Sequence, residues 1–158
     1  MKWYTKLQIL LACAVLALPN SGMRAAEGPA IANSEPVLPG ADLQAILDRG
    51  QNLQLEPGKI YPLKKPLLFK APGQTISTRH ATRISAYAVL QLAAVDCVQI
   101  INGNQMADIV LENVVLDGNR YALSDGKLSI HPGPLAYFGG QGARRQTIRR
   151  CVFTGTRT

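Results

Sequence analysis

The chain has 158 residues, 47% of them apolar, and a formal net charge of +7. If residues 1–26 are removed as a signal peptide, 132 residues with a net charge of +4 remain, because Lys2, Lys6 and Arg24 leave with it. That length suits one domain. So mild a basicity does not indicate a nucleic-acid partner, and an export signal argues against one.

Residues 1–26 are predicted to be a secretory signal peptide, which places the mature protein outside the cell or in the periplasm. Lys2 and Lys6 precede an apolar run at 7–18, and small residues follow at 25–26. The run is short for a bilayer span, so we expect no membrane span after cleavage. Cys13 follows a sequence resembling a lipoprotein box, but the apolar run continues past it, which favours an ordinary signal.

Two segments precede the first expected strand. Residues 27–40 contain three prolines and no periodicity, and are predicted to be a disordered tail or linker. Residues 41–49 are predicted to form a short helix, because Leu43, Ile46 and Leu47 share one helical face. So short a helix is not stable alone, so its apolar face is expected to cap the strands that follow.

The remaining chain is predicted to be all-β, since short alternating runs are separated by turn residues. The expected strands before the repeats are 52–56, 60–63, 66–70, 75–77, 83–86 and 89–92.

A repeat follows these strands. Residues 147–155 align without a gap with residues 110–118, an offset of 37. A third strand precedes each segment, at 98–101 and at 135–138, again 37 apart. Three strands per repeat predict the coils of a parallel β-helix. An antiparallel sandwich with strands of similar sequence is the alternative.

The alignment makes specific predictions about side chains. Leu111 should stack on Ile148, and Val114 on Cys151, with all four side chains inside. Asn113 separates two alternating runs and predicts a sharp corner, because asparagine tolerates positive φ better than most residues.

The mature chain keeps two cysteines, Cys97 and Cys151. Alternation places Cys151 inward and, with Val98 and Ile100 inward, Cys97 outward. We therefore expect no disulfide between the two, although an exported protein could form one.

The stretch from the helix at 41–49 through 53–63, 66–70 and 72–76 resembles the start of pectate-lyase-like proteins, and 114–120 resembles the end of one of their coils. The resemblance covers 41–155. It implies a right-handed parallel β-helix with a short N-terminal capping helix. Proteins of that superfamily usually have many more coils, so we expect residues 41–158 to be the N-terminal portion of a truncated β-helix with an open end after Phe153.

Candidate chemical residues are few. The acids near the repeats belong to no catalytic or calcium motif, so no catalytic residue and no metal site is predicted; they are Asp96, Asp108, Glu112, Asp117 and Asp125. His80 and His131 are interpreted as surface loop residues, and 121–134 as an insertion that either builds a binding surface or has no role.

Arginines give the strongest signal for binding. Arg144, Arg145 and Arg149, followed by Arg150, could bind the carboxylates of a uronate chain. A basic edge that discourages strand pairing is the simpler interpretation.

Two functions remain open. One is the N-terminal part of a secreted polysaccharide lyase or glycoside hydrolase acting on an acidic polysaccharide, with its catalytic coils absent from this chain. The other is a non-catalytic exported β-helix that binds glycan or another protein. The residues indicate no cofactor, and only the resemblance to the lyases introduces calcium.

The signal peptide gives the first testable prediction. Exported protein should begin near Ala26 or Glu27, because the small residues of the cleavage site end there. N-terminal sequencing of secreted or periplasmic material measures this directly. A cytoplasmic protein that retains Met1 would contradict it.

Overall fold

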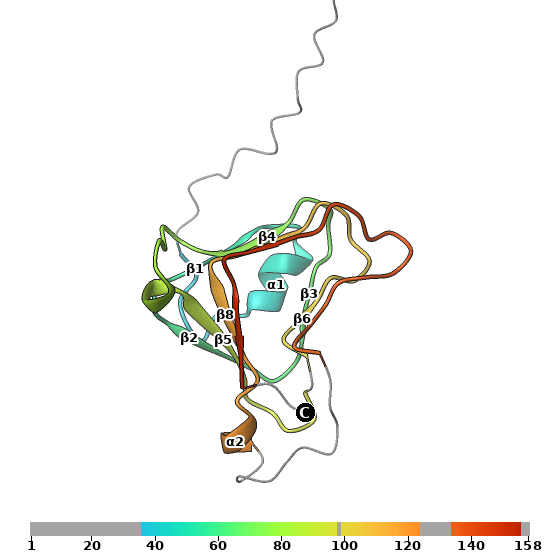
Figure 1. The fold of residues 1–158 in the computed structure, drawn as a ribbon. Coiled ribbons are helices and arrows are strands. Elements are labelled where there is room, and N and C mark those ends of the chain that lie inside the picture. Colours follow the sequence, from blue (N-terminus) through green and yellow to red (C-terminus); the bar gives the residue numbers. More distant parts are fainter. Residues whose placement is uncertain (1–35, 98, 124–133, 156–158) are drawn as a thin grey trace, which may run out of the picture.

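The structure, a computed structural model, describes residues 36–97, 99–123 and 134–155. Eleven short strands follow a short N-terminal helix in the described chain (Figure 1). The helices are α1 (Leu43–Asp48), the 3-10 helix η1 (Ile84–Ala86) and α2 (Arg120–Leu123). The strands are β1 (Leu53–Leu55), β2 (Ile60–Leu63), β3 (Leu67–Leu68), β4 (Thr75–Thr78), β5 (Ala88–Leu92), β6 (Ile101–Asn102), β7 (Val110–Glu112), β8 (Val114–Asp117), β9 (Ala136–Tyr137), β10 (Thr147–Arg149) and β11 (Val152–Thr154).

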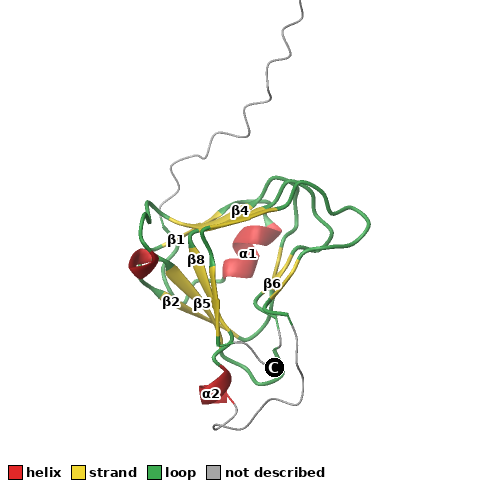
Figure 2. Ribbon diagram, in the orientation of Figure 1, coloured by secondary structure: helices red, strands yellow, loops and turns green. Residues whose placement is uncertain are grey.

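The strands form three parallel sheets that the chain visits in a fixed cyclic order. The sheets have the orders β1-β4-β7-β10, β11-β8-β5-β2 and β3-β6-β9. Every strand therefore pairs with the strand three places along the chain, and the sheets surround one core (Figures 1 and 2). This arrangement is compatible with a parallel β-helix. We call each passage through the three sheets a rung.

The register confirms the predicted stacking of the repeats. Leu111 pairs with Ile148 on one side and with Ile76 on the other, in parallel strands. Val115 pairs with Val152 in the next sheet, also in parallel. The antiparallel sandwich is therefore wrong.

Parallel register puts apolar residues of successive rungs into inward columns. The alternation predicted from the sequence is confirmed where a rung has neighbours on both sides, since Ile109, Leu111, Val114 and Leu116 are all fully buried. Burial of such aliphatic side chains contributes about 1.5–3 kcal/mol each to folding. The predicted corner at Asn113 is also confirmed, because its φ is 55°.

One polar contact ties two rungs together inside the coil. The Thr78 hydroxyl donates a hydrogen bond to the carbonyl oxygen of Asn113 at 2.5 Å and accepts one from the Ala88 amide at 2.9 Å. The backbone groups at this corner are thereby satisfied without water.

The glycines that directly follow β8 and β11, Gly118 and Gly155, stack on each other. A Cβ atom at Gly118 would overlap the carbonyl group of Gly155, and a Cβ at Gly155 would overlap the Asp117 side chain. Glycine is required here by close backbone approach.

Helix α1 packs on the first rung. Asp42 caps it by accepting a hydrogen bond from the Ala45 amide at 3.0 Å, and Leu43 and Leu47 are buried. The helical spacing predicts an outer position for Gln44, and this prediction is wrong. Its amide bonds both backbone groups of Leu68, at 2.8 and 3.1 Å, and so covers the free edge of β3.

The described part of the predicted tail also contacts the first rung. Val37 forms a parallel bridge with Leu55, and its amide donates to the Gln54 carbonyl at 2.7 Å. The free edge of β1 is covered in this way.

Three strand-level predictions need correction. Arg83 does not begin a strand, because residues 84–86 form the 3-10 helix η1 instead. The strand expected at 98–101 is β6, and Ile101 pairs with Ala136, an offset of 35 and not 37. The turn before β10 is correspondingly longer than the turn before β7, so one offset does not describe the whole rung.

Within the described residues, Cys97 and Cys151 are not joined by a disulfide. The outward position predicted for Cys97 is wrong, because it is buried, and its thiol donates to the Gln99 carbonyl at 3.1 Å. That prediction depended on Val98, which lies outside the described residues. Cys151 is half-buried, as expected of an inward residue in the last described rung, and this burial raises the pKa of its thiol.

The last described rung is covered on one side. Ile148 and Phe153 are each 45% exposed, although their partners Leu111 and Leu116 are fully buried. Within the described residues, no strand pairs with the outer edges of β10 and β11. In the part of the chain that is described, no helix is long and apolar enough to cross a membrane.

The role of α1 as a cap gives a prediction about stability. Leu47→Asp should strongly lower the melting temperature, because Leu47 is fully buried against the first rung and an unpaired carboxylate there is costly. Loss of a buried leucine side chain alone costs about 2–5 kcal/mol. Thermal unfolding followed by circular dichroism measures the change.

The matched control is Leu38→Asp, the same substitution at a residue that is 60% exposed. It should leave the melting temperature nearly unchanged. Equal melting temperatures for the two variants would show that α1 does not stabilise the rungs.

Candidate functional site

The candidate site is a cluster of arginines around β10, which we call the arginine edge; it comprises Arg144, Arg145, Arg149 and Arg150. The first two lie in the turn before β10, Arg149 ends the strand, and Arg150 forms the corner that follows. Arg145 and Arg150 have positive φ values of 48° and 50°. All four are exposed, and they lie on the last described rung.

Arg145 is paired with the rung beneath it. Its Nε and Nη2 atoms donate to the two carboxylate oxygens of Asp108 at 2.5 and 2.7 Å. The two residues are 37 positions apart, so the pair is a vertical contact between successive rungs. The bidentate contact lowers the pKa of the Asp108 carboxyl and raises the pKa of the Arg145 guanidinium.

Arg149 and Arg150 converge on one carboxylate. Arg149 donates from Nη2 to Glu112 at 2.5 Å, and Arg150 forms an ion pair with the other oxygen of Glu112. Arg150 also donates from Nε to the Asn113 side-chain oxygen at 2.7 Å. The Glu112 side chain is only 14% exposed, so both cations are held close to the sheet surface.

Arg144 differs from the other three. Its carbonyl oxygen accepts a hydrogen bond from the Asp108 amide at 2.9 Å, but its guanidinium has no ion-pair partner among the described residues. The arginine edge thus sets four positive charges against the two carboxylates of Asp108 and Glu112. A positive surplus remains on this part of the surface.

The structure brings together all three predicted binding residues, Arg144, Arg145 and Arg149. Asp108 and Glu112 were noted as acids near the repeats, but their pairing with Arg145 and Arg149 was not predicted. A signal for these acids was present, because the offset of 37 aligns Arg149 with Glu112 and Arg145 with Asp108.

The other candidate residues have structural roles or lie elsewhere. Asp117 accepts hydrogen bonds from the Asn119 amide at 2.9 Å and from Gln91 at 2.8 Å, as expected of a turn residue. Asp125, His131 and most of the insertion at 121–134 lie outside the described residues. Among those described, no group of three or more His, Cys, Asp or Glu residues could hold a metal ion.

Comparisons with known proteins add no assignment. No family model, no curated protein and no solved structure matches the chain.

The Asp108–Arg145 contact gives a prediction about pH. Arg145→Ala should raise the pKa of Asp108 towards the ordinary value of 3.8, because the hydrogen-bonded guanidinium favours the charged carboxylate. NMR titration of the Asp108 carboxyl carbon measures it. The lowered pKa also means that the pair stabilises the fold above that ordinary value, and that this contribution is lost as the pH falls through the folded-state pKa.

Arg144→Ala serves as the control, since Arg144 acts on Asp108 only through its charge and without a side-chain hydrogen bond. It should raise the pKa less than Arg145→Ala. An Asp108 pKa that is unchanged in Arg145→Ala would show that the contact does not form in solution.

Proposed function

We propose that the chain is an exported, right-handed parallel β-helix of the pectate-lyase-like kind whose arginine edge binds an acidic polysaccharide. The observation that carries the proposal is the surplus of positive charge on one edge of stacked rungs, with Arg144 unpartnered among the described residues. The resemblance of 41–155 to pectate-lyase-like sequences supports the architecture and the class of ligand.

The paired arginines retain donors for a ligand. A guanidinium carries five N–H donors in a planar fork. Arg145 directs its Nε and one Nη2 hydrogen at Asp108, and Arg149 directs one Nη2 hydrogen at Glu112. A uronate carboxylate can bind the remaining donors without displacing either acid. The acids then position the arginines, and the ligand supplies the missing negative charge.

The proposed role of the arginine edge is to bind a ligand and not to catalyse a reaction. The arginine edge offers charged donors at fixed positions along a sheet, which suits a repeating anionic chain. Asp108 and Glu112 are each occupied by arginines, so neither is proposed as an acid, a base or a nucleophile.

Polygalacturonate binding tests the proposal. Arg144→Gln combined with Arg149→Gln should weaken binding about tenfold in low salt, because two charge-assisted contacts are lost. Rising salt should weaken the wild-type binding, since the contacts are exposed to solvent. Isothermal titration calorimetry with polygalacturonate, and with neutral dextran as a non-binding ligand, measures both effects.

Arg83→Gln combined with Arg79→Gln is the matched control, with the same loss of charge between β4 and β5. It should leave the affinity within about twofold of wild type. If both double variants weaken polygalacturonate binding equally, the effect comes from net charge alone and not from the arginine edge. An absence of binding by the wild type at low salt would reject the proposal.

A further inference from the structure

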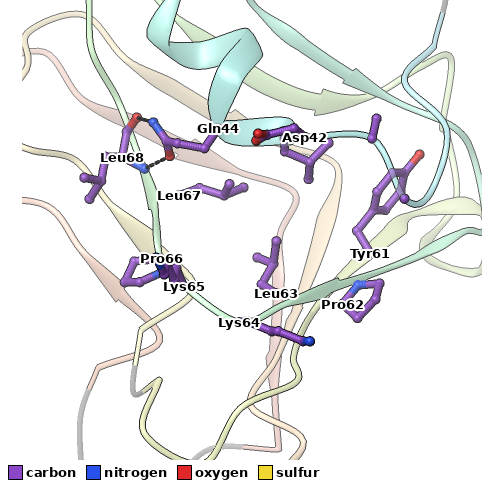
Figure 3. Close-up of a pocket in the computed structure, with 13 residues that line it drawn as sticks. Asp42, Gln44, Tyr61, Pro62, Leu63, Lys64, Lys65, Pro66, Leu67 and Leu68 are labelled. Atoms are coloured by element: carbon purple, nitrogen blue, oxygen red, sulfur yellow. Dashed lines mark hydrogen bonds between the residues drawn. The ribbon is translucent and has the colours of Figure 1, made fainter.

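A cleft of about 580 Å³ lies beside the N-terminal helix, away from the arginine edge. It is formed by residues 40–44, which lead into α1, and by residues 61–68, which contain most of β2 and all of β3 (Figure 3). Its volume falls within the range of about 300–1,000 Å³ that is typical of sites for small molecules.

The wall of the cleft is mainly apolar. Leu63, Leu67 and Tyr61 lie on its inner side (Figure 3) but are only 7%, 3% and 2% exposed. The apolar surface open to a ligand therefore comes mainly from Ala41, Pro62 and Pro66. The Tyr61 hydroxyl is already engaged, because it donates to the Val37 carbonyl and accepts from the Glu56 amide at 2.8 Å. Because the residue is also only 2% exposed, Tyr61 supports the wall from behind and offers a ligand neither its ring nor its hydroxyl.

The adjoining edge of β2 is unsuited to an added strand. The carbonyls of Lys59 and Leu63 accept hydrogen bonds from β5, both at 2.8 Å, so alternation turns Ile60 and Pro62 towards the free edge. Pro62 has no N–H to donate, and a proline on an edge interrupts strand pairing. Strand addition by an extended peptide is therefore disfavoured at this edge, which leaves the cleft better suited to a small molecule.

Two lysines at the border of the cleft favour a negatively charged head group on a bound molecule. Lys64 and Lys65 lie in its lining, and neither forms an ion pair with any described residue. The same lysines border a smaller hollow that contains Asp96, which also makes no ion pair with them. The one acid in the lining, Asp42, is occupied as the helix cap and lies at the opposite end from Lys64 (Figure 3).

We propose that this cleft binds a free alkyl monocarboxylate of the fatty-acid type. The alkyl chain lies against Ala41, Pro62 and Pro66, and the carboxylate lies at Lys64 and Lys65. Apolar contact supplies most of the affinity, and the lysines determine the sign of the head group. This site is independent of polysaccharide binding, because it lies on the first rung and the arginine edge on the last.

Dodecanoate binding to the full chain tests the proposal. Titration of a fluorescent dye out of the cleft, confirmed by calorimetry, should give saturable 1:1 binding of dodecanoate. Dodecyltrimethylammonium, which has the same alkyl chain and a cationic head, should bind at least about tenfold more weakly. Lys64→Gln combined with Lys65→Gln should weaken dodecanoate binding about tenfold and leave the cationic ligand little changed.

Lys59→Gln is the control for net charge, because Lys59 lies just before β2 and outside the lining. It should bind dodecanoate as wild type does. The proposal is overturned if dodecanoate does not bind, if both head groups bind equally, or if Lys59→Gln weakens binding as much as the double variant. All three substitutions are at exposed lysines, so loss of folding will not mask the result.

Discussion

The parallel, in-register stacking of successive rungs is the constraint on which the rest of the structure depends. Because Leu111 pairs with Ile76 below and Ile148 above, each side chain in a paired strand lies over its counterpart in the next rung. Apolar positions then form a continuous core, and polar positions form outer columns. The same rule brings Gly118 and Gly155 into backbone contact and leaves no room for a Cβ atom at either position.

Stacking also creates the charged surface. Asp108 meets Arg145, and Glu112 meets Arg149, because each pair occupies the same place in successive rungs. Exposed ion pairs of this kind contribute little to stability, because water and salt screen them. Their main effect is to hold guanidinium groups at fixed positions with donors to spare. The arginine edge is thus a consequence of the repeat as well as a candidate binding surface.

Much of this could be predicted from the sequence, for a physical reason. Alternation and the offset of 37 identify the residues that form the inward columns. The buried core around Leu111 and Val114 and the parallel pairing could therefore be predicted. The bounds and register of the shortest strands could not be predicted. Strand β6, for example, has only two residues, which are too few to show an alternating pattern. Cys97 shows the limit, since alternation fails where the chain is not in a strand. The cleft was also hidden, because it depends on how α1 sits on the first rung.

The pairing partners of Thr147 test the central claim most directly. Parallel stacking places Thr147 beside Val110 when Ile148 lies beside Leu111, whereas antiparallel pairing would place it beside Glu112. Backbone nuclear Overhauser effects in an isotopically labelled chain distinguish the two. Contacts from Thr147 to Val110 and from Arg149 to Glu112 are expected. Contacts from Thr147 to Glu112 and from Arg149 to Val110 would contradict the stacked parallel rungs.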